Sequence, residues 1–394
     1  MVSRGGLSEM ILTLLFGALP LAIWLHMIFG RGMFWLMRER DDRGEPAEPA
    51  VWPSITAVVP ARDEADVIAR AIGGLLSQDY PGDFRVILVD DQSTDRTAEI
   101  AREAARAAWA VDRLEVMSGH TLPAGWTGKL WAVSQGVEWA CASAPDYLLL
   151  TDADIGHAPD NLRHLAARAQ AGGYAMVSLM AKLSCINAAE RFLIPAFVYF
   201  FDMLFPFGQV NRVKSRVAAA AGGCMLVRRE ALEAAGGIAS IRHEIIDDCA
   251  LGRRMKAQGP IWLGLTERAV SLRPYQNVAE IGRMVSRSAY AQLGYSVLVL
   301  AGVIAGMVLT YVAPPAAAIF GSGLLRVMGL AAWTLMAISF WPMLRFYRLS
   351  PLWGVALPAI GAAYTWFTVQ SAIQVWRGRG GMWKGRAQAM AGNA

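Results

Sequence analysis

The sequence predicts an α/β domain, with a mostly parallel sheet flanked by helices, set between apolar helices near the two ends of the chain. Three observations predict this fold class. Between residues 51 and 290, short apolar strands alternate with helical patterns. Long apolar runs precede and follow this region. Across 394 residues, a hydrophobic fraction of 55% and a charged fraction of 18% indicate membrane segments.

Charge and cysteine content indicate the kind of partner and the redox compartment of the protein. The net charge of +5 is modest for 394 residues, and basic residues cluster beside apolar runs, which favours a membrane surface over nucleic acid as partner. The four cysteines lie far apart, with no CxxC pair and no histidine at metal-ligand spacing. We therefore expect reduced, mostly buried thiols in a reducing compartment.

Residues 1–30 are predicted to form an N-terminal transmembrane anchor. The run from Leu7 to Gly30 is apolar apart from Glu9 and His26. At about 1.5 Å per residue it can span a hydrocarbon layer of about 30 Å. A signal peptide is the alternative, but no small-residue cleavage site follows the run. Four arginines follow it, within a linker of residues 31–50, and predict that the next domain is cytoplasmic: Arg31, Arg38, Arg40 and Arg43.

Residues 51–290 are predicted to form the α/β domain. Its first part alternates strands and helices in the order ITAVVP, residues 65–77, FRVILVDD, residues 94–108, RLEVMS, residues 129–142 and YLLLTDAD. This order is typical of a mostly parallel sheet covered by helices. Ligands of such sheets bind beyond the carboxyl ends of the strands. The polar residues that follow three of the strands, at 62–64, 90–91 and 152–154, should therefore line one crevice.

Residues 291–376 are predicted to form C-terminal transmembrane helices, with candidate spans near 292–312, 324–344 and 352–376. Pro314 and Pro315, and later the stretch RFYRLSP, are expected to break the runs. Three crossings would put the basic tail, residues 377–394, on the side opposite the α/β domain, against the positive-inside tendency. Either one run does not cross, for example the last, or the rule fails here.

Another apolar stretch, Arg191 to Gly208, lies inside the α/β region. It is rich in aromatic residues, but it contains Asp202 and two prolines and is short for a span. Two interpretations remain open. The stretch is either a core helix or an element lying in the membrane interface.

Asp152 and Asp154 end the YLLLTDAD strand, and two like charges at a buried strand end require a partner. On an extended chain, side chains two residues apart point the same way, so both carboxylates would face one site while Ala153 faces the other side. Mg²⁺ or Mn²⁺ suits such a pair, because these ions take one or two carboxylates plus substrate phosphate oxygens. The alternative is that the aspartates cap the next turn or helix.

The neighbouring strand ends resemble the nucleotide-binding half of the family 2 glycosyltransferases of the inverting, GT-A type. The family's Pro-x-x-Asn/Asp-Glu turn is matched by Pro60 to Glu64, and its acidic pair before a Ser/Thr-Asp-x-Thr helix start is matched by Asp90 to Thr97. The resemblance implies a nucleotide-sugar site that includes Pro60, Arg62, Glu64, Asp90, Asp91 and Asp152. Carboxylates there can accept hydrogen bonds from uracil N–H and ribose hydroxyl groups. Asp95 is explained mainly as a helix N-terminal residue.

Two further elements resemble the same family. In GWTGKLWA, Gly128 and Lys129 open a helix in the place of a Gly-Lys-x-x-Ala element, which implies that Lys129 contacts phosphate; a solvated lysine is the alternative. The stretch RHEIIDDCALGRRMKAQG resembles the acidic third motif. The family gives the role of general base to the second aspartate, hence Asp248, supported by Asp247 and Glu244. The alternative is that these are ordinary acids at a helix start. Upstream, Gly222 and Gly223 resemble an acceptor-side strand that a substrate can approach.

One family element is missing. Processive members carry Gln-x-x-Arg-Trp on an interfacial helix, whereas this chain has RMVSRSAYAQLGYS, with Arg283 and Arg287 but neither the glutamine nor the tryptophan. Either arginine could neutralise a leaving diphosphate or contact lipid headgroups, and both interpretations stay open. The departure argues against a processive polymer synthase.

Taken together, the motifs and flanking apolar runs resemble the hopene-associated glycosyltransferases of bacterial hopanoid gene clusters. The resemblance covers nearly the whole chain and implies a multi-pass enzyme of the bacterial inner membrane with a cytoplasmic catalytic domain. Its partners would be a nucleotide-diphosphate sugar, a lipid acceptor and the membrane, and its cofactor Mg²⁺ or Mn²⁺. Two alternatives remain: a processive polysaccharide synthase and a non-catalytic membrane scaffold. A transporter is disfavoured, because the spans are few and carry little charge.

Overall fold

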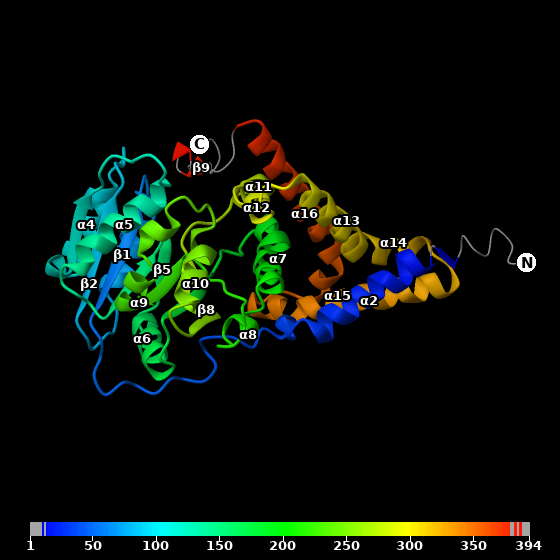
Figure 1. The fold of residues 1–394 in the computed structure, drawn as a ribbon, viewed down its shortest axis with the longest axis horizontal. Coiled ribbons are helices and arrows are strands. Elements are labelled where there is room, and N and C mark those ends of the chain that lie inside the picture. The colour runs from blue at the N-terminus through cyan, green and yellow to red at the C-terminus, as the bar shows by residue number, and fades with distance from the viewer. Residues whose placement is uncertain (1–9, 12, 379–381, 384–385, 388–394) are drawn as a thin grey trace, which may run out of the picture. The chain divides into compact units, whose positions relative to one another are not determined.

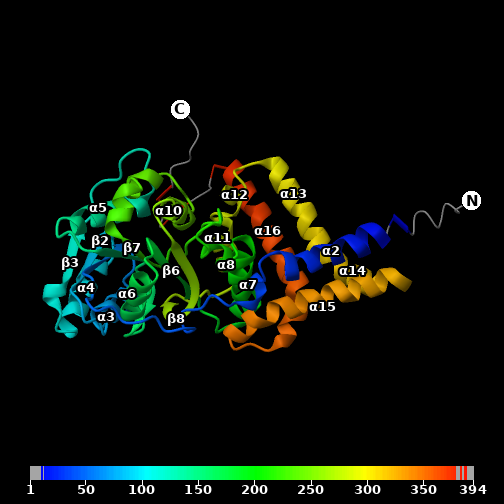
Figure 2. The same ribbon diagram turned by 60° about the horizontal axis from the view of Figure 1, so that its bottom comes forward.

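A computed structural model describes residues 10–11, 13–378, 382–383 and 386–387 of the chain (Figures 1 and 2). Two compact units are present. Unit 1 comprises Met1–Arg38, Cys185–Pro206 and Tyr275–Gly380, and unit 2 comprises Glu39–Ser184, Phe207–Pro274 and Gly381–Ala394. All four cysteines lie within the described residues, and none of them forms a disulfide bond.

Unit 2 is built on an eight-stranded sheet with the strand order β3-β2-β1-β4-β7-β6-β8-β5. Strands β1, β2, β3 and β4 pair in parallel, as predicted, whereas β7 runs antiparallel to both of its neighbours. The strands span Ile55–Ala61 (β1), Phe84–Asp90 (β2), Leu114–Ser118 (β3), Tyr147–Thr151 (β4), Ile155–His157 (β5), Met176–Lys182 (β6), Cys224–Arg228 (β7) and Ile261–Ser271 (β8). The predicted sheet flanked by helices is confirmed.

Helices cover both faces of this sheet because side chains alternate along the strands. Val59 of β1 belongs to the core beneath α3 (Ile68–Leu76), α4 (Thr97–Ala107) and α6 (Asn161–Ala171). Its neighbour Val58 faces α5 (Gly128–Cys141) on the other side. There a Cβ on Gly136 would come within 2.5 Å of the Val58 side chain, so this glycine lets the helix approach the sheet closely.

The remaining elements of unit 2 are short. They are the helices α8 (Phe207–Val210), α9 (Arg229–Ala234) and α10 (Asp247–Lys256), the 3₁₀ turns Val111–Arg113 and Ile238–Ile241, and a ribbon of β9 (Met382–Trp383) and β10 (Arg386–Ala387). Lys256 of α10 donates from Nζ to the carbonyls of Val210 (2.7 Å) and Val217 (2.6 Å), which holds both ends of the loop after α8.

Four segments meet at one edge of the sheet. In the parallel pairs, Ala61 of β1 lies opposite Asp90 of β2, so the residues that follow these strands are neighbours. Because β7 is antiparallel to β4, with Cys224 opposite Thr151, the preceding glycines 222–223 lie at the edge where β4 ends. The fold therefore brings the segments after β1, β2 and β4 to the same edge as the start of β7.

Unit 1 is helical. An N-terminal helix runs from Leu14 to Gly30 as α2 (Leu19–Leu25) between two π-helical turns, and a 3₁₀ turn follows at Phe34–Leu36. The other helices are α7 (Ala188–Leu204), α11 (Val278–Ser286), α12 (Ala289–Gln292), α13 (Val297–Met307), α14 (Ala313–Phe320), α15 (Gly323–Phe346) and α16 (Leu357–Trp376), with a π-helical turn at Val308–Val312 and a 3₁₀ turn at Pro351–Ala356. Of the predicted anchor, residues 1–9 and 12 lie outside the described residues.

The N-terminal helix packs along α15 in the same direction. Near its start, a Cβ on Gly17 would lie 3.2 Å from the side chains of Leu325 and Met328. After its end, the Phe34 ring lies 5.3 Å from the ring of Tyr199, which also contacts the Phe340 ring (5.2 Å). The starts of these two helices therefore lie together, and so do their ends.

The prolines at 314 and 315 do not end the helix, contrary to the prediction. The chain stays helical from Val297 to Phe320, because the two prolines occupy the first positions of α14 directly after the π-helical turn. A proline lacks an N–H that the first turn of a helix does not need, and a local π-helical adjustment accommodates its ring. The break at RFYRLSP is confirmed, because α15 ends at Phe346 and the next turn begins at Pro351.

Helix α16 returns to the start of α13. Ser371 Oγ accepts a hydrogen bond from the backbone N–H of Tyr290 on α12 (3.0 Å), and the rings of Tyr290 and Trp376 lie 5.9 Å apart. Leu300, on the first turn of α13, packs in the same cluster as Ala372. Both views show α13–α14 and α15 as a hairpin, with α16 running across its open end (Figures 1 and 2).

Helix α7, in the apolar stretch at 191–208, lies between β6 and β7 in the chain. Asn187 and Glu190 form a capping box at its start, and Glu190 also accepts the backbone N–H of Tyr275 at 2.8 Å. By length and composition, four described helical segments could span a membrane: 188–210, 297–320, 323–346 and 351–376. The N-terminal helix is apolar but shorter, at 14–30.

Candidate active site

Asp152 and Asp154 lie in the turn between β4 and β5 rather than on an extended strand. Strand β4 ends at Thr151, and the backbone N–H of Ile155 donates to the carbonyl of Asp152 at 3.2 Å. The extended conformation that this prediction assumed is wrong, because the chain turns here, although the two carboxylates and Ala153 do lie on opposite sides. Ala153 is 3% exposed and belongs to the core, while the two carboxylates stay on the polar side, each beside a cation.

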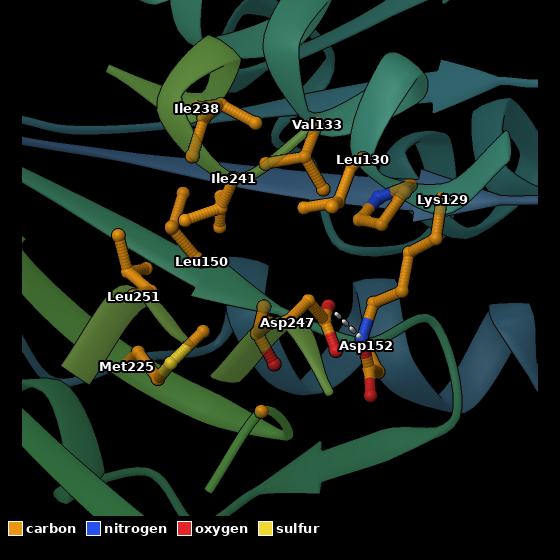
Figure 3. A pocket seen from close by; sticks show the side chains of 13 residues that line it. Lys129, Leu130, Val133, Leu150, Asp152, Met225, Ile238, Ile241, Asp247 and Leu251 are labelled. Atoms are coloured by element: carbon orange, nitrogen blue, oxygen red, sulfur yellow. Dashed lines mark ion pairs between the residues drawn. The ribbon is translucent and has the colours of Figure 1, made fainter. Parts of the chain in front are cut away.

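Lys129 joins two of the predicted carboxylates, as Figure 3 shows. Its Nζ lies 2.8 Å from Asp152 Oδ1 and 3.3 Å from Asp247 Oδ2. The lysine is the second residue of α5, whose N-cap Thr127 accepts from the Leu130 N–H at 3.4 Å. Burial lowers the pKa of Lys129, but the charges of Asp152 and Asp247 outweigh burial and raise it. Lys129 is therefore a charged ammonium held between the two aspartates, not a solvated side chain.

Asp248 lies at the start of α10 and is held by two backbone donors. Its Oδ2 accepts the N–H of Gly222 at 3.1 Å, and its Oδ1 accepts the N–H of Cys249 at 2.7 Å. A Cβ on Gly222 would lie 3.4 Å from the Asp248 Cβ, so the two residues are in close contact. Burial and the neighbouring Asp247 charge raise the pKa of Asp248 to about 6, against the effect of Lys129. A carboxylate of this pKa can accept a proton near neutral pH.

Arg273, which follows β8, connects Asp154 to Glu64. Its guanidinium forms an ion pair with Glu64, and its Nε lies 3.9 Å from Asp154 Oδ2. Burial, together with the charges of Asp152 and Glu64, raises the pKa of Asp154 to about 6, while Arg273 and Lys129 lower it. The predicted nucleotide-binding turn and the predicted metal-binding turn are thus linked by one arginine.

The predicted nucleotide-binding residues form a second polar group. Arg62 Nη1 donates to the carbonyl of Asp91 (2.5 Å) and lies 3.6 Å from its carboxylate, which is fully buried. Asp90 Oδ1 accepts the N–H of Ser93 at 3.1 Å. Asp95 accepts the N–H of Thr97 at 2.9 Å and that of Ala65 at 3.1 Å, which agrees with its interpretation as a helix-start residue.

A small cavity of about 20 Å³ lies beside Lys129, Asp152 and Asp247 (Figure 3). Gly222, Pro60 and Thr151 also line it, and the remaining lining side chains are apolar: Leu130, Val133, Leu150, Met225, Ile238, Ile241 and Leu251. Ion pairs in such low-polarity surroundings are screened less than at a protein surface.

A divalent cation fits these residues together with substrate oxygens. Among the residues that the structure describes, no group of three or more His, Cys, Asp or Glu side chains is arranged to hold a metal ion. Asp152 and Asp154 offer two carboxylates, and burial, followed by the charges of Asp152 and Glu64, raises the pKa of Asp154. Because Mg²⁺ and Mn²⁺ accept one or two carboxylates plus phosphate oxygens, the pair suits a metal bound with a diphosphate.

Two arginines that the sequence suggested for diphosphate binding belong to unit 1, and one arginine of the site was not predicted. Arg283 and Arg287 lie on or next to α11 in unit 1; Arg283 is exposed and lies 3.7 Å from Glu280. Contact of either with diphosphate or headgroups stays a prediction. Arg273 was missed, although the LRPY stretch that contains it follows a long apolar strand, a position comparable to that of the acids at the other strand ends.

Comparison with known sequences identifies the family of the central region. Residues 56–236 match the model described as Glycosyl transferase family 2. Similar curated proteins include a beta-monoglucosyldiacylglycerol synthase from Nostoc sp., 28% identical over 186 residues (47% of this chain, 38% of that protein). They also include a 4,4'-diaponeurosporenoate glycosyltransferase from Staphylococcus aureus, 35% identical over 102 residues (26% of this chain, 24% of that protein). The chain thus spans less than half the length of these relatives.

Solved structures agree with the fold. A mannosyltransferase from Pyrobaculum calidifontis, in complex with GDP-Man and Mn²⁺, superposes with a TM-score of 0.53 at 18% identity and covers 91% of this chain and 98% of that chain. At this identity the likeness concerns the fold. Residues 56–236 of this chain therefore match a glycosyl transferase family 2 domain, and the fold is GT-A.

Proposed function

We propose that the protein is a membrane-bound inverting glycosyltransferase that moves one sugar from a nucleotide-diphosphate donor to a lipid hydroxyl. The observation that carries the proposal is the placement of Lys129 between Asp152, on the proposed donor side, and Asp247, beside the proposed base. A phosphate-binding cation and a proton acceptor of raised pKa thus lie within one small site.

Each residue of the site has a role in this reaction. Glu64, Asp90 and Asp91 accept hydrogen bonds from the nucleoside, and Arg62 orders the Asp91 segment. Lys129 contacts the diphosphate, and Asp152 and Asp154 would hold Mg²⁺ or Mn²⁺. When bound, that ion stabilises negative charge on the departing diphosphate. Asp248 accepts the proton of the acceptor hydroxyl as its oxygen attacks the anomeric carbon from the face opposite the leaving group, which inverts the configuration.

A lipid acceptor is supported by the relatives and by unit 1. The names of the curated relatives refer to lipids, a monoglucosyldiacylglycerol in one and diaponeurosporenoate in the other. Unit 1 supplies apolar helices of membrane-spanning length in the same chain. Single transfer is supported by the missing Gln-x-x-Arg-Trp element, and a hopanoid acceptor is supported by the resemblance of the sequence to hopene-associated glycosyltransferases.

The proposal is tested with full-length protein in nanodiscs, Mn²⁺, radiolabelled UDP- or GDP-sugars and a bacterial lipid extract that contains hopanoids. We expect one labelled lipid, one sugar heavier than its acceptor, after thin-layer chromatography and mass spectrometry. A ladder of products would instead indicate a processive synthase. A protein that neither binds a nucleotide sugar in calorimetry nor transfers one would fit the scaffold.

We further propose an inner-membrane topology with three crossings, in which the N-terminal helix, helix 297–320 and α15 cross and α7 and α16 do not. Helix α7 joins β6 to β7, which are hydrogen-bonded neighbours, so a crossing would separate two paired strands. The N-terminal helix and α15 run in the same direction, and unit 2 follows the N-terminal helix in the chain, so both helices end on the cytoplasmic side in this proposal. Because α12 and the end of α16 are in contact, α16 starts and ends on that side.

This topology removes the conflict with the positive-inside tendency, because it leaves the basic tail in the cytoplasm with unit 2. A fusion of alkaline phosphatase after residue 394 should be inactive in cells, and a green fluorescent protein fused there should fluoresce. The matched control is an alkaline phosphatase inserted at Gly321, in the outer turn of the hairpin, which should be active. Activity of the C-terminal phosphatase fusion would contradict the topology.

A further inference from the structure

We propose that His157 is a positioning residue that fixes the spacing between the donor-side acid Asp152 and the base Asp248 through a directed hydrogen-bond chain. The chain runs from Asn161 through His157 and Thr151 to the carbonyl of Gly223. Thr151 also lines the small cavity beside Lys129 and Asp152, whereas Asn161 and His157 do not. This inference rests on the proposed function, which supplies the reason why the spacing matters.

The atoms of the chain lie in the protein interior. Asn161 is 0% exposed, Thr151 2% and His157 7%. His157 Nδ1 lies 2.8 Å from Asn161 Nδ2, and His157 Nε2 lies 3.0 Å from Thr151 Oγ1. Thr151 Oγ1 in turn donates to the Gly223 carbonyl at 2.7 Å. The three hydrogen bonds join β4, β5, the start of α6 and the segment before β7.

The donor and the acceptor of each hydrogen bond follow from the last acceptor of the series, the Gly223 carbonyl. The Gly223 carbonyl can only accept, so the single hydroxyl proton of Thr151 points toward it. Thr151 Oγ1 must then accept from His157, which puts a proton on Nε2 of the imidazole. Burial lowers the pKa of His157 to about 4, so the ring is neutral and its Nδ1 accepts from the Asn161 amide. The histidine therefore acts as a neutral donor in one defined tautomer.

Two members of this series of hydrogen bonds, Thr151 and Gly223, lie one residue from the proposed chemistry. Thr151 directly precedes Asp152, whose carboxylate pairs with Lys129. Gly223 directly follows Gly222, whose backbone N–H donates to Asp248 Oδ2 at 3.1 Å. The Thr151 hydroxyl thus links the end of β4 to the glycine pair through a side chain, beside the backbone pairing of Thr151 with Cys224. Loss of this link would let the two acids move relative to each other.

The test compares conservative and disruptive variants at two positions. Thr151→Val keeps the shape of threonine but removes the hydroxyl, whereas Thr151→Ser keeps the hydroxyl. His157→Leu removes the donor, whereas His157→Gln keeps an N–H donor at a similar reach. Leu165→Ala is the control for general loss of stability, because Leu165 is a buried core residue of α6 that takes no part in these hydrogen bonds.

Two readouts separate this inference from the proposed function. The first readout is hydrogen exchange of the full-length protein, followed in peptides that contain Gly222. This measurement needs no nucleotide sugar. Exchange there should be at least tenfold faster in Thr151→Val and His157→Leu and within threefold of wild type in the other three variants. Calorimetry with Mn²⁺ and the nucleotide sugar should show affinity lowered at least tenfold in the same two variants.

Wild-type exchange in both disruptive variants would overturn the inference, and so would equal acceleration in Leu165→Ala at matched thermal stability. A His157→Gln protein that behaves like His157→Leu would also overturn it. If the wild type binds no nucleotide sugar, the proposed function fails, while the exchange data still decide whether the hydrogen-bond chain holds the glycine pair.

Discussion

Replacing Asp248 by asparagine should nearly abolish sugar transfer, because the amide cannot accept the proton of the acceptor hydroxyl. General-base catalysis contributes about 10²- to 10⁴-fold, and we expect a fall in kcat within that range. Donor affinity should stay within about threefold of wild type, since Asp248 contacts backbone N–H groups of Gly222 and Cys249 rather than the proposed diphosphate site. Steady-state transfer assays and donor calorimetry on the same preparation measure both quantities.

The pH profile gives an independent check on this residue. Because burial and the Asp247 charge raise the pKa of Asp248 to about 6, the carboxylate is protonated below that pH and cannot act as a base. The wild-type rate should therefore fall on the acid side with an apparent pKa near 6. Asp112→Asn, at an exposed aspartate outside the site, is the matched control and should keep the full rate and the same profile. A near-wild-type rate in Asp248→Asn would refute the assignment of the base.

Replacing Asp154 by asparagine should remove metal-dependent donor binding as well as transfer. The pair of carboxylates is expected to supply the protein ligands of the ion, and charge stabilisation by such an ion contributes several kcal/mol, on the order of 10²- to 10³-fold in rate. Calorimetry with the nucleotide sugar, with and without Mn²⁺, should show the Mn²⁺-dependent gain in affinity in wild type and not in Asp154→Asn. Asp112→Asn again serves as the control for loss of one exposed charge.

The two variants differ in a way that identifies the step each acid serves. Asp248→Asn should bind donor and metal but transfer slowly, whereas Asp154→Asn should lose the metal-dependent binding itself. Thermal unfolding checks that both proteins are folded. If Asp154→Asn kept the full Mn²⁺ effect on donor affinity, the metal would have to bind elsewhere, and the proposed roles of Asp152 and Asp154 would be wrong.

Much of the fold was predictable because it depends on local periodicity. The alternation of short apolar strands with amphipathic helices from Ile55 to Thr151 predicted β1 to β4 along the chain and their parallel pairing, but not their order β3-β2-β1-β4 within the sheet. Its strand ends then followed, since parallel strands carry their carboxyl ends to one edge. The details of turns were less predictable. The aspartate turn after β4 was expected to be extended, and Pro314 and Pro315 were expected to end a helix that in fact continues.

Contacts between distant segments account for most of what the sequence did not indicate. Lys129 meets Asp247 across 118 positions of sequence, and Arg273 meets Glu64 across 209. Neither pairing has a local signature, because each depends on how β7, β8 and α10 are placed in the sheet. The sequence around His157 does not indicate its role, because that role depends on contacts with Thr151 and Asn161 and on the bond from Thr151 to the Gly223 carbonyl.

The path of α7 has a practical consequence for preparing the protein. A water-soluble version of unit 2 cannot be obtained by trimming the two ends of the gene, since a strongly apolar insert would remain in the middle of the product. Such a version would also need residues 185–206 exchanged for a hydrophilic bridge between Ser184 and Phe207.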